Sequence, residues 1–157
     1  MPNSRFPEFA QTMPSEDLIR ALVHGFYAKV RADDALGPIF NRVISDWGPH
    51  LEKMCAFWSS VMRMSGRYHG NPMAAHLRLK TVKPEDFERW LSLFSETARE
   101  LCPEDIADAF VDRAHNIAHS LQLGMFYRPQ PRGSATRIGA NAANDGTGSL
   151  SDEIGAK

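Results

Sequence analysis

Apolar residues recur every three to four positions through most of this chain, which is the spacing of one buried face of an α-helix. The first stretch follows Ser15, a residue type that favours a helix N-cap, with Glu16 and Asp17 in the first turn, where acidic side chains are stabilising. The pattern therefore predicts an amphipathic helix with an apolar stripe of Leu18, Ile19, Leu22, Val23, Phe26, Tyr27 and Val30.

A second helix is predicted beyond an interruption that contains Asp33, Asp34, Gly37 and Pro38 and the short apolar sequence "PIF". Its stripe is wide and rich in aromatic residues: Trp47, His50, Leu51, Met54, Phe57, Trp58, Val61 and Met62. Gly66, Gly70 and Pro72 then interrupt the pattern again. They leave room only for a short helix around His76.

Two more long helices are predicted, and each begins with the sequence Pro-Glu-Asp, at Pro84 and at Pro103. The inner face of the first consists of Phe87, Trp90, Leu91, Phe94, Ala98 and Leu101. That of the second consists of Ile106, Phe110, Ile117, Leu121 and Met125. No stretch alternates between apolar and polar residues as a strand would, so we expect an all-α fold of four main helices and one short helix.

The two ends of the chain differ in composition from the helical part. Residues 1–13 have no sustained period, and residues 128–157 are rich in Pro, Gly, Ser, Ala and Asn, with no aromatic residue. Such a segment has too few large apolar side chains to offset the entropy of ordering. We therefore expect an N-terminal extension (1–13), one domain (14–127) and a flexible tail (128–157).

The charge and cysteine content of the chain limit which kinds of binding partner and which cellular compartment we expect. The chain of 157 residues has 18 basic and 19 acidic side chains, so no overall positive field favours nucleic acid or anionic lipid. No apolar run approaches the ~18 residues that a membrane span needs, and no signal peptide is visible. Cys55 and Cys102 form no Cys-x-x-Cys unit. We expect a cytoplasmic monomer with free thiols that binds neither nucleic acid nor membrane.

Histidine is the residue type that could carry chemistry, because no phosphate-binding loop, nucleophile elbow or zinc signature is present. His24 and His69 follow no pattern, and we expect them at the surface. His115 and His119 lie four residues apart, a spacing that can share a metal, but no third ligand accompanies them. We interpret both as ordinary helix residues.

His50 and His76 differ from the other histidines because each projects from an apolar helix face. A single such histidine is usually a core residue bonded to a carbonyl or a hydroxyl group. A pair, together with this much aromatic volume, suits a flat apolar cofactor such as haem, whose iron accepts one neutral imidazole. The alternative is a helical interaction domain with buried histidines, which would fold without a cofactor and be colourless.

Four segments in this order also resemble the group III truncated haemoglobins: "FYAKVRADDALGPIF", "DWGPHLEKMCAFW", "YHGNPMAAHLRL" and "FERWLSLF". The resemblance covers about residues 15–127. It implies a two-over-two helical sandwich around haem b. The absence of Cys-x-x-Cys-His agrees with a haem that is not covalently attached.

The resemblance also implies roles for individual residues. His76 corresponds to the proximal iron ligand, and Tyr27, His50 and Trp90 to residues of the distal ligand pocket. His76 has no acidic neighbour, so we expect its second nitrogen to donate to a backbone carbonyl. Other positions are expected to pack against the macrocycle or the pocket wall (Phe26, Phe40, Met54, Trp58 and Tyr68) or to meet the propionates (Arg78 and Lys80).

The expected function is reversible binding of O₂, CO and NO at a pentacoordinate haem iron. Phenol and indole donors suit bound O₂, which carries partial negative charge. His50 could donate to the ligand, swing as a gate or ligate the iron. The alternative function is a redox enzyme, an NO dioxygenase or a peroxidase-like protein that uses peroxide. Such an enzyme would need an external reductase, because the chain has no flavin or nicotinamide motif.

Overall fold

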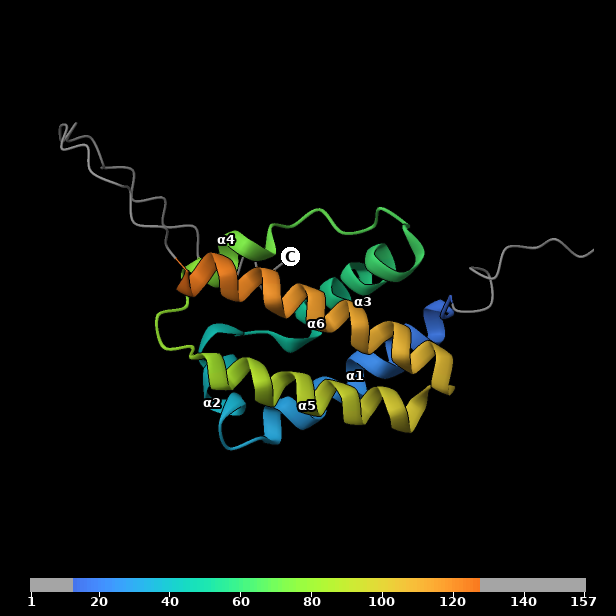
Figure 1. The fold of residues 1–157 in the computed structure, drawn as a ribbon, viewed down its shortest axis with the longest axis horizontal. Helices are drawn as coiled ribbons and strands as arrows, with labels where there is room; N and C mark the ends of the chain where they lie inside the picture. The colour runs from blue at the N-terminus through green and yellow to red at the C-terminus, as the bar shows by residue number, and fades with distance from the viewer. Residues whose placement is uncertain (1–12, 128–157) are drawn as a thin grey trace, which may run out of the picture.

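The structure, a computed structural model, describes residues 13–127, which form six α-helices and no strand (Figure 1). The helices are α1 (Glu16–Ala32), α2 (Leu36–Val43), α3 (Trp47–Arg63), α4 (Pro72–Leu77), α5 (Pro84–Leu101) and α6 (Glu104–Phe126). The all-α prediction is confirmed. The predicted tail, and all of the predicted N-terminal extension except Met13, lie outside the described residues.

Local signals in the sequence account for where the helices begin. The Ser15 hydroxyl accepts a hydrogen bond from the backbone N–H of Leu18 at 3.1 Å, as an N-cap does. The Asn71 side chain caps α4 in the same way, and Pro72 occupies the first turn, where a missing N–H is tolerated. At α5, the carboxylate of Asp86 accepts from the N–H of Lys83 at 2.9 Å.

Helix α2 corrects the expectation that residues 33–46 only interrupt the helical pattern. The Asp33 carboxylate accepts from the N–H groups of Ala35 (3.1 Å) and Leu36 (3.0 Å) and so begins a new helix. Pro38 lies in its first turn, where its ring breaks no helical hydrogen bond. The prediction of four main helices and one short helix was therefore wrong by one helix.

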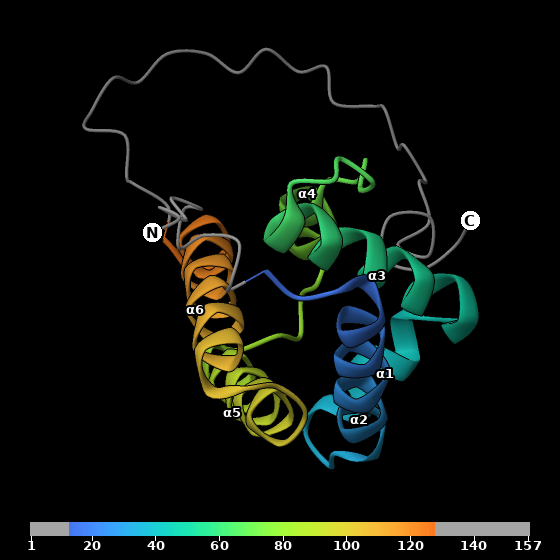
Figure 2. The ribbon, with the colours of Figure 1, turned by 90° about the vertical axis from the view of Figure 1, so that its right-hand side faces the viewer.

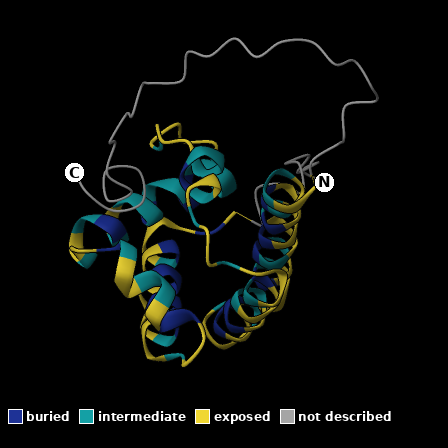
Figure 3. Ribbon diagram, turned by 90° about the vertical axis from the view of Figure 1, so that its left-hand side faces the viewer, coloured by how far each residue is buried: buried dark blue, intermediate teal, exposed yellow. Residues whose placement is uncertain are grey.

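Two pairs of helices form two layers, as the resemblance implied. In the end-on view of Figure 2, α5 and α6 lie on one side, and α1 and α3 lie on the other. Figure 3 shows the buried residues on the faces that the layers turn toward each other and the exposed residues outside. Between the layers, Trp58 of α3 stacks on Phe94 of α5, with ring centroids 4.8 Å apart. The predicted two-over-two sandwich is confirmed.

The short helix α4 packs against the C-terminal half of α6, where Met73 lies over Gly124. A Cβ atom at residue 124 would meet the Met73 sulfur, so an alanine there would require the flexible end of the Met73 side chain to move. None of the helices in residues 13–127 is both long and apolar enough to cross a membrane.

Candidate functional site

All six helices contribute to one apolar cavity. The space inside it that atoms leave unfilled is about 1050 Å³, including the part that opens to solvent. Its walls are formed by Tyr27, Leu36, Ile39, Phe40, Val43, His50, Met54, Phe57, Trp58, Tyr68, Pro72, Ala75, His76, Leu79, Val82, Asp86, Phe87, Trp90, Ile117, Ala118 and Leu121. A mostly apolar and aromatic lining with a few polar groups is typical of sites for cofactors and small molecules.

His76 lies on α4 and lines the cavity, and a hydrogen bond fixes the orientation of its ring. Its Nδ1 atom is 2.6 Å from the carbonyl oxygen of Pro72, which confirms the expected backbone partner. A carbonyl can only accept, so Nδ1 carries the proton and Nε2 keeps its lone pair. Burial lowers the pKa of His76, and the bond to Pro72 opposes this shift. His76 is therefore a neutral imidazole, the form that ligates metals.

His50 lies on α3 and is 1% exposed. Its ring stands edge-to-face to Tyr27 of α1, with centroids 5.2 Å apart, and to Trp47, with centroids 5.4 Å apart. Burial, followed by the charge of Lys53, lowers the pKa of His50 to about 4. His50 is therefore neutral at pH 7 and has one N–H to donate.

Tyr27 is a buried phenol at the wall of the same cavity. Burial, followed by the negative charge that Cys55 would carry, raises the pKa of Tyr27 above its usual range, so its hydroxyl remains protonated and can donate. Its ring contacts Phe26 (4.9 Å) and Phe40 (6.0 Å) edge-to-face. Tyr27 is thus a protonated donor on a ring that its neighbours hold in place.

Trp90 of α5 adds an indole N–H to the residues that line the cavity. Its ring stacks on Phe94 at 5.5 Å with an interplanar angle of 12° and stands edge-to-face to Phe26 at 5.3 Å. Aromatic contacts on two sides limit the rotation of the indole. The residues that line the cavity therefore include two with a polar hydrogen to donate, Tyr27 and Trp90, besides the neutral His50.

The structure brings most of the predicted site residues together. Tyr27, Phe40, His50, Met54, Trp58, Tyr68, His76 and Trp90 all line the cavity. Phe26 lies behind this wall, in contact with Tyr27 and Trp90, and Arg78 and Lys80 are exposed and outside the lining. The other four histidines, His24, His69, His115 and His119, are exposed, which was the expectation for His24 and His69.

Of the wall residues of α2, Phe40 was predicted from the sequence but Leu36, Ile39 and Val43 were not, and the wall residues of α6 (Ile117, Ala118 and Leu121) were not assigned to the site either. The α2 residues were missed because the capping role of Asp33 was not recognised. Ile117 and Leu121 were predicted to face inward, but periodicity does not show which inward residues leave space between them. Within residues 13–127 no cluster of three or more His, Cys, Asp or Glu side chains could hold a metal ion.

Comparison with known proteins gives one consistent result. The chain is 36% identical, over 118 residues, to the group 3 truncated hemoglobin ctb of Campylobacter jejuni, and the match spans 73% of this chain and 92% of that protein. The crystal structure of group III truncated hemoglobin from Campylobacter jejuni superposes with a TM-score of 0.70 at 35% identity. That match covers 73% of this chain and 93% of the crystallised chain. No family model matches the sequence.

Proposed function

Because this chain belongs to the group III truncated haemoglobins, we propose that it holds haem b without a covalent bond in the cavity described above. We further propose that it binds O₂, CO and NO reversibly, with His76 as the one residue of the protein that would ligate the iron. The observation that carries the proposal is that one apolar cavity is lined by a neutral imidazole, His76, and by three other polar rings, Tyr27, His50 and Trp90.

The residues present fit haem in chemistry. The aromatic and aliphatic walls suit a flat apolar macrocycle, and the lone pair on Nε2 of His76 is the donor that haem iron accepts. When bound, haem supplies an iron with one coordination position open to a diatomic ligand.

The protein holds the proximal side through Pro72 and His76. The Pro72 carbonyl fixes both the tautomer and the orientation of the imidazole. Peroxidases usually have a carboxylate at this nitrogen, which increases electron donation from the histidine. A neutral carbonyl partner therefore favours ligand binding over a peroxidase-like reaction.

On the distal side, Tyr27 and Trp90 can donate hydrogen bonds to a ligand that carries partial negative charge, and His50 can add a third. Each bond contributes about 1 kcal/mol net, and more toward a charged acceptor, so two donors slow O₂ dissociation by about 10- to 100-fold. The apolar walls provide a low local dielectric, which strengthens each bond. NO dioxygenation could use the same donors, together with an external reductase.

We propose indirect roles for two of the predicted residues that lie outside the cavity lining. Phe26 supports Tyr27 and Trp90 from behind through its edge-to-face contacts with both rings. Arg78 lies two positions after His76 at the surface, where a propionate would meet solvent.

The test is the absorption spectrum of the purified protein in its oxidised, reduced and CO-bound states. We expect a Soret band that His76→Gly weakens or shifts and that added imidazole restores. His69→Ala, which changes an exposed histidine of the preceding loop, is the matched control and should keep the parent spectrum. A parent protein that stays colourless after haem is supplied would overturn the proposal.

A further inference from the structure

The loop of residues 64–71 joins α3 to the helix that carries His76, and all of its residues except Tyr68 are exposed. Met64, Gly66, Arg67 and His69 are exposed, and Met64 (φ 52°) and Gly66 (φ 69°) have left-handed backbone conformations. Segments with little apolar burial open more readily than the core around them. Polar contacts must therefore contribute most of what fixes this loop.

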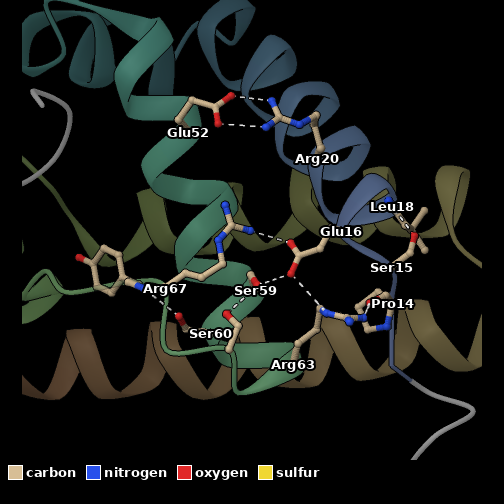
Figure 4. A network of polar contacts seen from close by, with 12 residues as sticks. Pro14, Ser15, Glu16, Leu18, Arg20, Glu52, Ser59, Ser60, Arg63 and Arg67 are labelled. Carbon is tan, nitrogen blue, oxygen red and sulfur yellow. Dashed lines mark hydrogen bonds and ion pairs between the residues drawn. The ribbon is translucent and has the colours of Figure 1, made fainter.

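Those contacts converge on Glu16, in the first turn of α1 (Figure 4). Its Oε1 atom accepts from the Ser59 hydroxyl at 2.6 Å and lies 3.3 Å from Nε of Arg63. Its Oε2 atom accepts from Arg67 at 2.9 Å. One carboxylate thus joins the start of α1 to the end of α3 and to the loop.

Two further bonds extend the network along the loop. The hydroxyl of Ser59, a fully buried residue, lies 2.7 Å from the Ser65 hydroxyl, and the Ser60 hydroxyl accepts from the N–H of Tyr68 at 2.9 Å. The loop is therefore anchored at residues 65, 67 and 68, and two of these anchors run to Glu16. Connected bonds that include a buried member stabilise more than an isolated surface ion pair does.

The anchored loop forms part of the cavity wall. The Tyr68 ring lines the cavity and packs edge-to-face on Phe57, with centroids 5.1 Å apart. A shift of the loop would move Tyr68 and release the N-terminal end of α4, four residues before His76.

We propose that Glu16 is a positioning residue that holds the loop of residues 64–71 against the cavity and so slows the loss of haem. This inference rests on the haem-binding function proposed above. Glu16 does not line the cavity, and it acts through Arg67, Ser59 and Ser65.

The structure offers a matched control on the same pair of helices. Arg20 of α1 and Glu52 of α3 form a two-pronged ion pair, at 2.5 and 3.0 Å, while the charge of Arg67 reaches Glu52 only at longer range and its hydrogen bond goes to Glu16. Glu52→Gln therefore removes a comparable ion pair between α1 and α3 and leaves the loop anchors in place.

The experiment compares the full chain, Glu16→Gln and Glu52→Gln, each loaded with haem. We would measure haem transfer to excess apomyoglobin and hydrogen exchange of the peptide that covers residues 64–71. Glu16→Gln should accelerate both rates by about 5- to 10-fold, which is the effect of losing roughly one charge-assisted bond, whereas Glu52→Gln should stay near the parent. Arg67→Ala should accelerate haem transfer and exchange less in the Glu16→Gln background than it does in the parent chain.

Equal effects of the two glutamine variants, or no effect of Glu16→Gln, would overturn the proposal. If Glu16→Gln unfolds, Ser65→Ala replaces it, because it removes only the loop end of the network; no faster exchange in that variant would also overturn the proposal. If the parent takes up no haem, the proposed function fails. Exchange of residues 64–71 in the haem-free chain then still decides whether Glu16 holds the loop.

Discussion

The Nδ1 atom of His76 lies 2.6 Å from the carbonyl oxygen of Pro72, four residues earlier in the same short helix. This contact directs the proton to Nδ1 and the lone pair to Nε2, so one local bond sets the tautomer that a metal ligand needs. The contact depends on α4 being formed, and a helix of six residues is marginal without its cap and its packing against α6.

Asn71→Ala is therefore expected to weaken the site without touching the cavity. The Asn71 side chain accepts from the N–H of Ala74 at 3.1 Å, and loss of an N-cap costs about 1 kcal/mol. We expect haem to dissociate about fivefold faster, measured by transfer to apomyoglobin. Asn116→Ala, at an exposed position inside α6, is the control, and an equal effect of the two variants would contradict this account.

Tyr27→Phe tests the hydrogen bond from the phenol, because it removes the hydroxyl and keeps the ring contacts with Phe26 and His50. O₂ dissociation, measured by stopped-flow displacement with CO, should be about tenfold faster, while CO dissociation changes little. Tyr127→Phe, at the exposed end of α6, should match the parent. Unchanged O₂ dissociation in Tyr27→Phe would show that the phenol does not donate to the ligand.

The lowered pKa of His50 predicts that the folded chain loses stability in mild acid. Its pKa in the folded chain is about 4, below its ordinary value of 6.5. Between these two values the unfolded chain binds a proton that the folded chain does not. The free energy of unfolding therefore falls as the pH drops from about 6.5 to about 4, by up to about 1.4 kcal/mol per pH unit for one such group.

Urea unfolding between pH 7 and pH 4.5 would measure this effect. The haem-free chain is used so that no metal is bound to Nε2 of His76. His50→Gln should show a shallower pH dependence than the parent; some dependence remains because burial also lowers the pKa of His76. The exposed His24→Gln should follow the parent curve. Parallel curves for the parent and His50→Gln would refute the prediction.

Two glycines in the first turns of helices should respond in opposite ways to alanine. A Cβ at Gly37 of α2 would lie 2.7 Å from the carbonyl oxygen of Arg31, and a backbone atom cannot easily move away. At Gly48 of α3, the nearest atom would be at 3.6 Å, an ordinary contact.

We expect Gly37→Ala to lower the free energy of unfolding by about 1–3 kcal/mol, as overpacking does. Gly48→Ala should be neutral or stabilising by up to about 1 kcal/mol, because alanine favours the helix more than glycine does. Thermal and urea unfolding would measure both. A Gly37→Ala variant as stable as the parent would mean that α2 can move away from α1 at little cost.

The signals that sequence analysis used are local, and they predicted the local features of the structure. Caps, proline positions and apolar spacing act over a few residues, so the starts of α1, α5 and α6 and the carbonyl partner of His76 were predictable. The cap at Asp33 is equally local but went unrecognised, and with it the wall residues Leu36, Ile39 and Val43 of α2.

By itself, the sequence determined that the chain is helical, that it belongs with the truncated haemoglobins and that His50 and His76 lie on apolar faces. Only the tertiary structure decided which apolar residues leave a cavity between them and that Phe26 lies behind its wall. Packing alone also brought Glu16 to Arg67, 51 positions away. Periodicity identifies a buried face, whereas the partner of that face depends on how separate helices cross, and this is not encoded within any one helix.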